Sequence, residues 1–106
     1  MPDRADIIWL DFDPQVGREQ AGRRPALVIS SIIYNRIGLA LVCPITSKVK
    51  GYPFEVALPV SGKISGVVLA DALKNVDWRG RNADFIAKAV PAVIIEVQEK
   101  LRTLVL

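Results

Sequence analysis

Short apolar segments, most of them bounded by glycine, proline or serine, follow one another through most of the chain. In residues 6–13 the apolar side chains alternate between two faces with a period of two, which is typical of a half-exposed strand. Comparable runs occupy residues 25–31, 39–46, 54–58 and 66–70, and a weaker run spans 83–90. Residues 39–46 are almost continuously apolar, so we expect them to form the central strand, covered on both faces.

The C-terminal segment has a different pattern. Its apolar residues recur at helical spacing, and they are Val90, Ile94, Val97, Leu101 and Leu104. Pro91 suits the first turn of such a helix. For a chain of 106 residues, one helix and several short strands predict a single domain over residues 1–106, built as a compact and strongly bent β-barrel. We expect the sheet to close on itself, because closure removes exposed strand edges.

The composition excludes several classes of chemistry. Histidine is absent and Cys43 is the only cysteine, which excludes an internal disulfide, histidine-based triads and the usual zinc sites. We therefore expect neither a metal nor a cofactor. Acidic residues near the N-terminus, and apolar runs shorter than the roughly 18 residues of a membrane span, predict a cytoplasmic protein without a membrane anchor. A net charge of +3 gives a mild bias toward polyanions.

Basic side chains concentrate in three segments that we expect to be loops. They are Arg18, Arg23 and Arg24 in the polar stretch 14–25, Lys48 and Lys50 after Thr46, and Lys74, Arg79 and Arg81 around Trp78. If the barrel brings the three segments to one rim, they form a cationic groove with an aromatic ring for base stacking, which suits single-stranded nucleic acid. For any one cluster alone, ordinary solvated loop charge is the simpler interpretation.

Arg24 is the first candidate for catalysis. It stands directly before a predicted buried strand, so its backbone should be held rigidly. Its planar guanidinium could then present two donors to a phosphate. A structural salt bridge to Asp11 or Asp13 is an equally good interpretation from spacing alone.

Two further polar positions also have both a functional and a structural interpretation. Thr46, followed by Ser47, brings hydroxyls to the end of a predicted strand, where they either contact a ligand or form a turn. Glu19 is a lone carboxylate among arginines. Their positive field favours its ionised form, which makes it a poor general base unless a substrate removes its water.

Four runs carry a family resemblance: IIWLDFDPQVGREQAGRRPALVIS, VCPITS, KGYPFEV and GVVLADALKNVDWRGR. In this order, and from Asp6 to the helix after Pro91, the chain resembles the MazF/PemK family of toxin endoribonucleases, or mRNA interferases. The segments GREQAGRRP and KGYPFEV are more specific than any short motif. The resemblance implies a small SH3-like barrel with a C-terminal helix and a homodimer. It also implies ribosome-independent cleavage of single-stranded RNA, and an antitoxin partner whose acidic tail occupies the RNA groove.

The same resemblance implies roles for individual residues. The family's catalytic arginine falls on Arg24 in GRRP, and its catalytic threonine falls on Thr46 in PITS. Glu19, in REQAG, matches a loop position implicated in the site, and we include it among the catalytic candidates. The candidate RNA-binding residues are Arg18, Gln20, Arg23, Ser47, Lys48, Lys50 and Arg79.

The expected reaction is attack of the RNA 2′-hydroxyl on the adjacent phosphate, giving a 2′,3′-cyclic phosphate and a 5′-hydroxyl. Arg24 would stabilise the phosphorane and Thr46 would orient the phosphate. The proton acceptor could be Glu19, a water or Arg24 itself. Where this chain has Asp71 and Ala72, family members often have Asp-Gln, so one polar group that could contact RNA is missing. A gyrase-binding toxin of the CcdB type and a noncatalytic nucleic-acid-binding barrel are the alternative functions.

Overall fold

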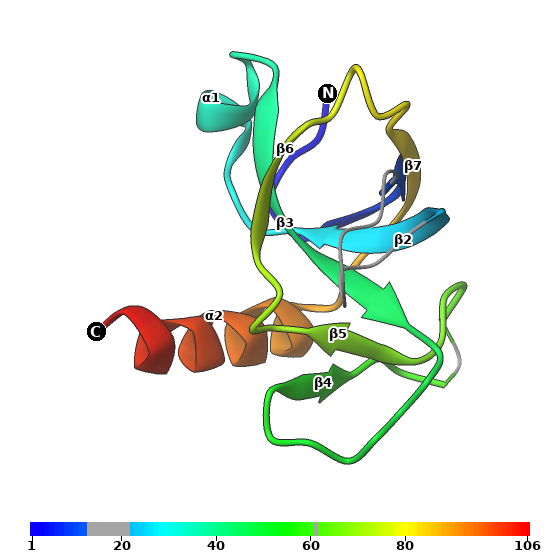
Figure 1. The fold of residues 1–106 in the computed structure, drawn as a ribbon, viewed down its shortest axis with the longest axis vertical. Coiled ribbons are helices and arrows are strands. Elements are labelled where there is room, and N and C mark those ends of the chain that lie inside the picture. The colour runs from blue at the N-terminus through cyan, green and yellow to red at the C-terminus, as the bar shows by residue number, and fades with distance from the viewer. Residues whose placement is uncertain (13–21, 61) are drawn as a thin grey trace.

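The structure is a computed structural model that describes residues 1–12, 22–60 and 62–106. Its elements are β1 (Asp6–Asp11), β2 (Arg23–Val28), α1 (Ile32–Asn35), β3 (Leu39–Thr46), β4 (Glu55–Ala57), β5 (Val67–Leu69), β6 (Lys74–Asp77), β7 (Asp84–Lys88) and α2 (Pro91–Val105) (Figure 1). In Figure 1, β3 runs from the neighbourhood of α1 down to the lower right, and α2 lies below the upper strands. In the described ranges, no helix has the length and apolar content needed to cross a membrane.

β3 is the central strand, as its apolar sequence predicts. The sheet order is β4-β5-β3-β2-β1-β7 with β6 also on β3, and every pair is antiparallel. One edge of β3 pairs with β2, while the other is shared: residues 39–42 pair with β6 and residues 45–46 with β5. Pro44 lies at this change of partner, where a residue without a backbone N–H is tolerated.

The expected closure of the barrel is wrong. Within the described part of the chain, β7 pairs with β1 alone and β4 with β5 alone, so the sheet ends at these two strands. The consecutive strands β6 and β7 stand at separate edges and are joined by residues 78–83. Trp78 and Ala83 of this connection pack against the buried cluster between the strands. Side chains, instead of a strand pair, therefore cover the interior at this connection. The predicted class, a mainly β fold with a C-terminal helix, is confirmed.

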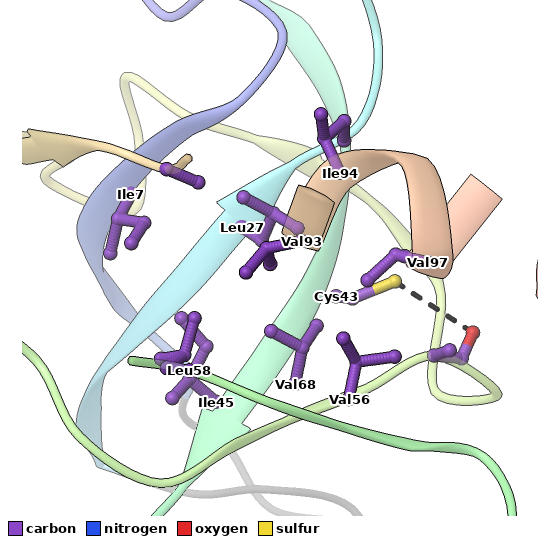
Figure 2. Packing of buried hydrophobic residues seen from close by; sticks show 12 residues of the cluster. Ile7, Leu27, Cys43, Ile45, Val56, Leu58, Val68, Val93, Ile94 and Val97 are labelled. Carbon is purple, nitrogen blue, oxygen red and sulfur yellow. Dashed lines mark hydrogen bonds between the residues drawn. The ribbon is translucent and has the colours of Figure 1, made fainter. Parts of the chain in front are cut away.

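Two apolar clusters lie on opposite faces of β2 and β3, because neighbouring residues of a strand point to opposite faces. In the first cluster, Leu27 and Cys43 pack against Val93, Ile94 and Val97 of α2 (Figure 2). The second cluster consists of Ile8, Leu10, Phe12, Ala26, Val28, Ala40, Val42 and Val76. The face with the second cluster is the one that concerns the candidate site.

Three features of the fold differ from the expectation. Arg23 and Arg24 belong to β2 and not to the preceding loop, and β6 includes Lys74, which we had placed in a loop. β6 escaped prediction because Val76 is its only buried residue. The short helix α1 depends on tertiary contacts, since the buried Asn35 amide donates to the carbonyls of Pro2 and Ser30, at 2.8 and 3.0 Å.

Candidate active site

Arg24 and Thr46 lie on neighbouring strands at the same end of the sheet. β2 and β3 are antiparallel with Ala26 opposite Pro44, and this register continued by two residues sets Arg24 across from Thr46. Alternate residues of a strand share a face, so both positions lie on the face of the second cluster, as Ala26 and Val42 do. The structure thus brings the two residues to one edge, although they are far apart in the sequence.

The backbone holds Thr46 tightly. The residue is 7% exposed, and its Oγ1 accepts a hydrogen bond from the Lys48 N–H at 3.1 Å. The turn-forming role is therefore observed, and a hydroxyl that accepts a hydrogen bond can still donate its own proton to a ligand. On the β5 side, Gly66 approaches so closely that a Cβ there would stand 2.2 Å from the Thr46 carbonyl oxygen. Only glycine fits this position.

Arg23 forms two salt bridges, one of them to Asp11, a residue that the sequence had suggested as a partner for Arg24. Its guanidinium nitrogens lie 3.1 Å from an Asp11 oxygen and 2.7 Å from an Asp84 oxygen. Asn82 also donates to Asp11, at 2.7 Å. The hydrogen bonds from Asn82 and Arg23 hold the pKa of the Asp11 carboxyl below its usual value. Arg23 therefore links β1, β2 and β7 next to Arg24 in the chain, on the opposite face of β2.

Lys74, which the sequence grouped with the basic residues around Trp78, contacts Phe12, a neighbour that the sequence did not reveal. Lys74 is paired with Val42, so it shares the face of the second cluster. Its ammonium lies 5.9 Å from the centre of the Phe12 ring, within cation–π range. The alternation of polar residues around Val76 was the signal for a strand there, but the run is only four residues long. A second basic residue thus joins Arg24 on this face.

Ser47, Lys48 and Lys50 follow Thr46 directly and are exposed. With Arg24 they form a cationic edge, which continues into the segment 47–54. This segment leaves β3 and passes below β4 in Figure 1. Arg18, Glu19 and Gln20 lie outside the described residues.

Arg79 is placed elsewhere. It follows β6, whose last residue pairs with Leu39 at the far end of β3 from Thr46. Its guanidinium stacks on Trp78, 4.8 Å from the ring centre, and the Trp78 indole donates to the Asn35 carbonyl at 2.9 Å. The expectation that three basic segments share one rim therefore fails for Arg79. From the same segment, Lys74 shares the face of Arg24, and the Arg81 guanidinium donates to the Asp11 carbonyl at 3.0 Å, beside Arg23. The aromatic ring expected beside them belongs to the other end.

Cys43 takes no part in the edge. It is fully buried in the first cluster, and its thiol contacts the Ala70 carbonyl at 3.8 Å. Burial, with a smaller contribution from the charge of Asp71, raises the pKa of the thiol to about 12. Across the described ranges, no three histidine, cysteine or acidic side chains come together as potential metal ligands.

The arrangement suits the binding of a phosphate diester. A guanidinium offers two parallel donors, a hydroxyl offers a third, and lysines beside them supply positive charge. Arg24 and Thr46 stand on strands packed against a buried cluster, which fixes their backbone positions. Fixed donors aimed at a phosphate stabilise the negative charge that develops when the phosphorus is attacked.

Comparisons with known proteins agree over nearly the full length. A family described as PemK-like, MazF-like toxin of type II toxin-antitoxin system matches residues 3–105. The endoribonuclease toxin MazF of Escherichia coli (strain K12) is 43% identical over 106 residues, covering 99% of this chain and 95% of the relative. The crystal structure of MazF from Deinococcus radiodurans has a TM-score of 0.94 at 53% identity, covering 97% of this chain and 94% of that chain. A MazE-MazF structure from the same organism has a TM-score of 0.89, with the same identity and coverage.

Proposed function

Because this chain belongs to the PemK-like, MazF-like toxin family of type II toxin–antitoxin systems, we propose that it cuts single-stranded RNA as a metal-independent, ribosome-independent endoribonuclease of the cytoplasm. Residues 1–106 act as one toxin domain in this proposal. The observation that carries it is the placement of Arg24 across from Thr46 at a cationic edge of the sheet. The relatives named as endoribonucleases favour cleavage over gyrase binding and over noncatalytic RNA binding.

The proposed reaction is an intramolecular displacement. The 2′-hydroxyl oxygen forms a bond to the adjacent phosphorus and the bond from phosphorus to the 5′ oxygen breaks. The departing 5′ oxygen takes up a proton from water, so the products are a 2′,3′-cyclic phosphate and a 5′-hydroxyl. The reacting atoms are already tethered, so the protein needs only to align them and stabilise charge. Arg24 binds the phosphorane oxygens and Thr46 holds the phosphate. A guanidinium does not release its proton, so we assign acceptance of the 2′-hydroxyl proton to Glu19, directly or through a water.

The remaining candidates bind the RNA strand on either side of the reacting phosphate. Lys48 and Lys50 extend from Thr46 along one side, while Ser47 adds a hydroxyl. Arg18 and Gln20 belong to the segment that leads into β2. Arg23, which is already bridged to Asp11 and Asp84, contributes positive charge at long range, and Arg79 contacts RNA that extends to the other end of β3.

The proposed partners are a second copy of the chain and an antitoxin. One structural neighbour is a MazE-MazF complex. An antitoxin with an acidic, extended tail would compete with RNA for the same cationic edge, because both are polyanions. Light scattering should report a two-fold dimer at micromolar concentration, and a monomer would contradict that part of the proposal.

The test is a substrate that lacks the nucleophile. An RNA with one 2′-deoxy nucleotide directly 5′ of the cut should bind nearly as well as the parent RNA, because phosphate contacts dominate affinity, but should resist cleavage. An all-RNA strand of the same sequence is the control. Cleavage of the substituted strand at the normal rate, or a plain 3′-hydroxyl on the 5′ fragment, would show that a water molecule is the nucleophile.

A further inference from the structure

Glu55 is the first residue of β4, and its carboxylate holds the end of the segment 47–54. One carboxylate oxygen accepts the backbone N–H of Lys50 at 3.0 Å. The other accepts the N–H groups of Gly51 and Tyr52 at 2.9 and 3.3 Å. Three consecutive backbone donors thus converge on one side chain. An ionised acceptor makes such bonds stronger than a neutral one does.

Other side chains fix the rest of the same segment. Thr46 Oγ1 accepts the Lys48 N–H at its start, and Lys100 of α2 donates to the Pro53 carbonyl at 2.7 Å near its end. Gly51 has a φ of +79°, a conformation that favours glycine, so the turn onto Glu55 is built into the sequence. The backbone that carries Lys48 and Lys50 is therefore tied to β3, β4 and α2.

A carboxylate at this place is unfavourable on charge alone. It lies next to the exposed Lys48 and Lys50, where its negative charge would oppose a polyanion. Its three hydrogen bonds explain why an acid stands there. The carboxylate weakens the attraction between this segment and a polyanion, but it holds the backbone of the lysines in a fixed position.

We propose that Glu55 is a positioning residue, which orients Lys48 and Lys50 for contact with RNA phosphates by ordering the backbone of residues 50–52. The inference rests on the proposed RNA-cleaving function and deepens it. Glu55 does not touch the RNA and takes no part in the chemical step. Its loss therefore affects RNA affinity and KM more than kcat.

For the RNA affinity of Glu55→Gln, positioning and net charge predict changes in opposite directions. Glu55→Gln makes the protein one unit more positive, so charge alone would strengthen RNA binding. Positioning predicts weaker binding, by about tenfold when one charge-assisted hydrogen bond is removed. Glu55→Asp keeps the charge but shortens the side chain by one methylene, so it should also weaken binding. Glu99→Gln, on the exposed side of α2, is the matched control for charge.

Two measurements on the full-length protein make the test. Hydrogen exchange of the Lys50, Gly51 and Tyr52 amides should accelerate in both Glu55 variants and stay unchanged in Glu99→Gln. Binding of a 2′-deoxy RNA that cannot be cut should weaken in both Glu55 variants, and the log–log salt slope should shrink by about 0.7 for each phosphate that the variant no longer binds. In a Lys50→Ala background the Glu55→Asp change should have a much smaller effect on binding.

Unchanged amide exchange in Glu55→Asp, or RNA affinity in Glu55→Gln that equals or exceeds that of Glu99→Gln, would overturn the proposal. A circular dichroism melt establishes that each variant is folded. If the parent protein neither binds nor cuts RNA, the proposed function fails, whereas the exchange data still decide whether Glu55 orders the segment. The two failures are therefore distinguishable.

Discussion

An alanine substitution is easier to interpret at Arg24 than at Thr46, because Arg24 is half-buried and Thr46 is buried. Arg24 is half-buried at the start of β2, so Arg24→Ala should leave the thermal midpoint close to that of the parent. Its cleavage rate should fall by about 10²- to 10³-fold, as expected for the loss of a donor that stabilises transition-state charge. Arg24→Lys should also be badly impaired, because an ammonium cannot reproduce the two-pronged contact. Cleavage of a defined RNA and a thermal melt check both results, and a near-parental rate in Arg24→Ala would place the site elsewhere.

For the buried Thr46, alanine would combine a loss of packing with the loss of the hydroxyl. Thr46→Val keeps the shape and removes the hydroxyl, so cleavage should fall while stability drops by about 1 kcal/mol for the unpaired Lys48 N–H. Thr46→Ser keeps the hydroxyl and should retain most of the activity. Equal rates for the two variants would show that the hydroxyl is unimportant.

The buried thiol of Cys43 should make the stability of the folded chain depend on pH. Its pKa in the folded chain is about 12, above the ordinary value of 9.0, so the unfolded chain loses the thiol proton first. The free energy of unfolding that Cys43 contributes is then complete below pH 9 and falls as pH rises toward 12. Between pH 8 and pH 10 the stability difference between the parent and Cys43→Ala should shrink by about 1 to 2 kcal/mol. Urea unfolding of both proteins at both pH values measures it, and a constant difference would contradict the raised pKa.

The elements were predictable where burial follows a regular period. The continuous apolar run of β3 predicted a strand covered on both faces, and Pro91 begins α2 as expected. The expectation of a half-exposed strand at β1 is wrong, because Ile7 lies in the first cluster and Ile8 in the second, so both faces are covered. β6 and α1 have no such signal, since β6 buries only Val76 and α1 has only four residues. Their structure depends on pairing with β3 and on contacts to the N-terminal residues. Such contacts join positions that the local pattern does not connect.

The close approach of Gly66, directly before β5, to the end of β3 should tolerate only glycine. At Gly66, with φ +114°, an added Cβ would meet the Thr46 carbonyl oxygen at 2.2 Å. Gly66→Ala should therefore push the two strands apart, reduce stability by about 2 kcal/mol or more and displace Thr46. Gly38→Ala is the control, because Gly38 has φ +100° but no atom within 4 Å of an added Cβ. It should lose only about 1 kcal/mol and keep its activity. Similar losses of stability and activity in the two variants would contradict the close approach.

In the molecule as a whole, the sequence predicts some residues of the candidate site and does not reveal others. Arg24 and Thr46 were found through motifs, and the antiparallel register of β2 and β3 sets them opposite each other. The bridge from Arg23 to Asp84 and the contact of Lys74 with Phe12 both join residues that are distant in the sequence, so spacing could not reveal them. Glu55 lies in the segment KGYPFEV, but neither this segment nor the spacing assigned it a role. Its function depends on the turn that brings three N–H groups to it.

The side chains of the molecule favour cleavage without a metal ion. Divalent cations need several ligands close together, and this chain has no histidine. Its carboxylates are scattered: across residues 1–12, 22–60 and 62–106, no three acidic or cysteine side chains come together. Its one thiol is buried with a pKa of about 12, so it does not offer a thiolate at neutral pH. Arg24 and the neighbouring lysines can supply positive charge to the phosphate in place of a metal ion. Cleavage should therefore keep its rate in excess EDTA, while a magnesium-dependent ribonuclease in the same buffer stops. Activity that disappears on chelation and returns with added magnesium would mean that a metal ion, and not Arg24, carries the charge stabilisation.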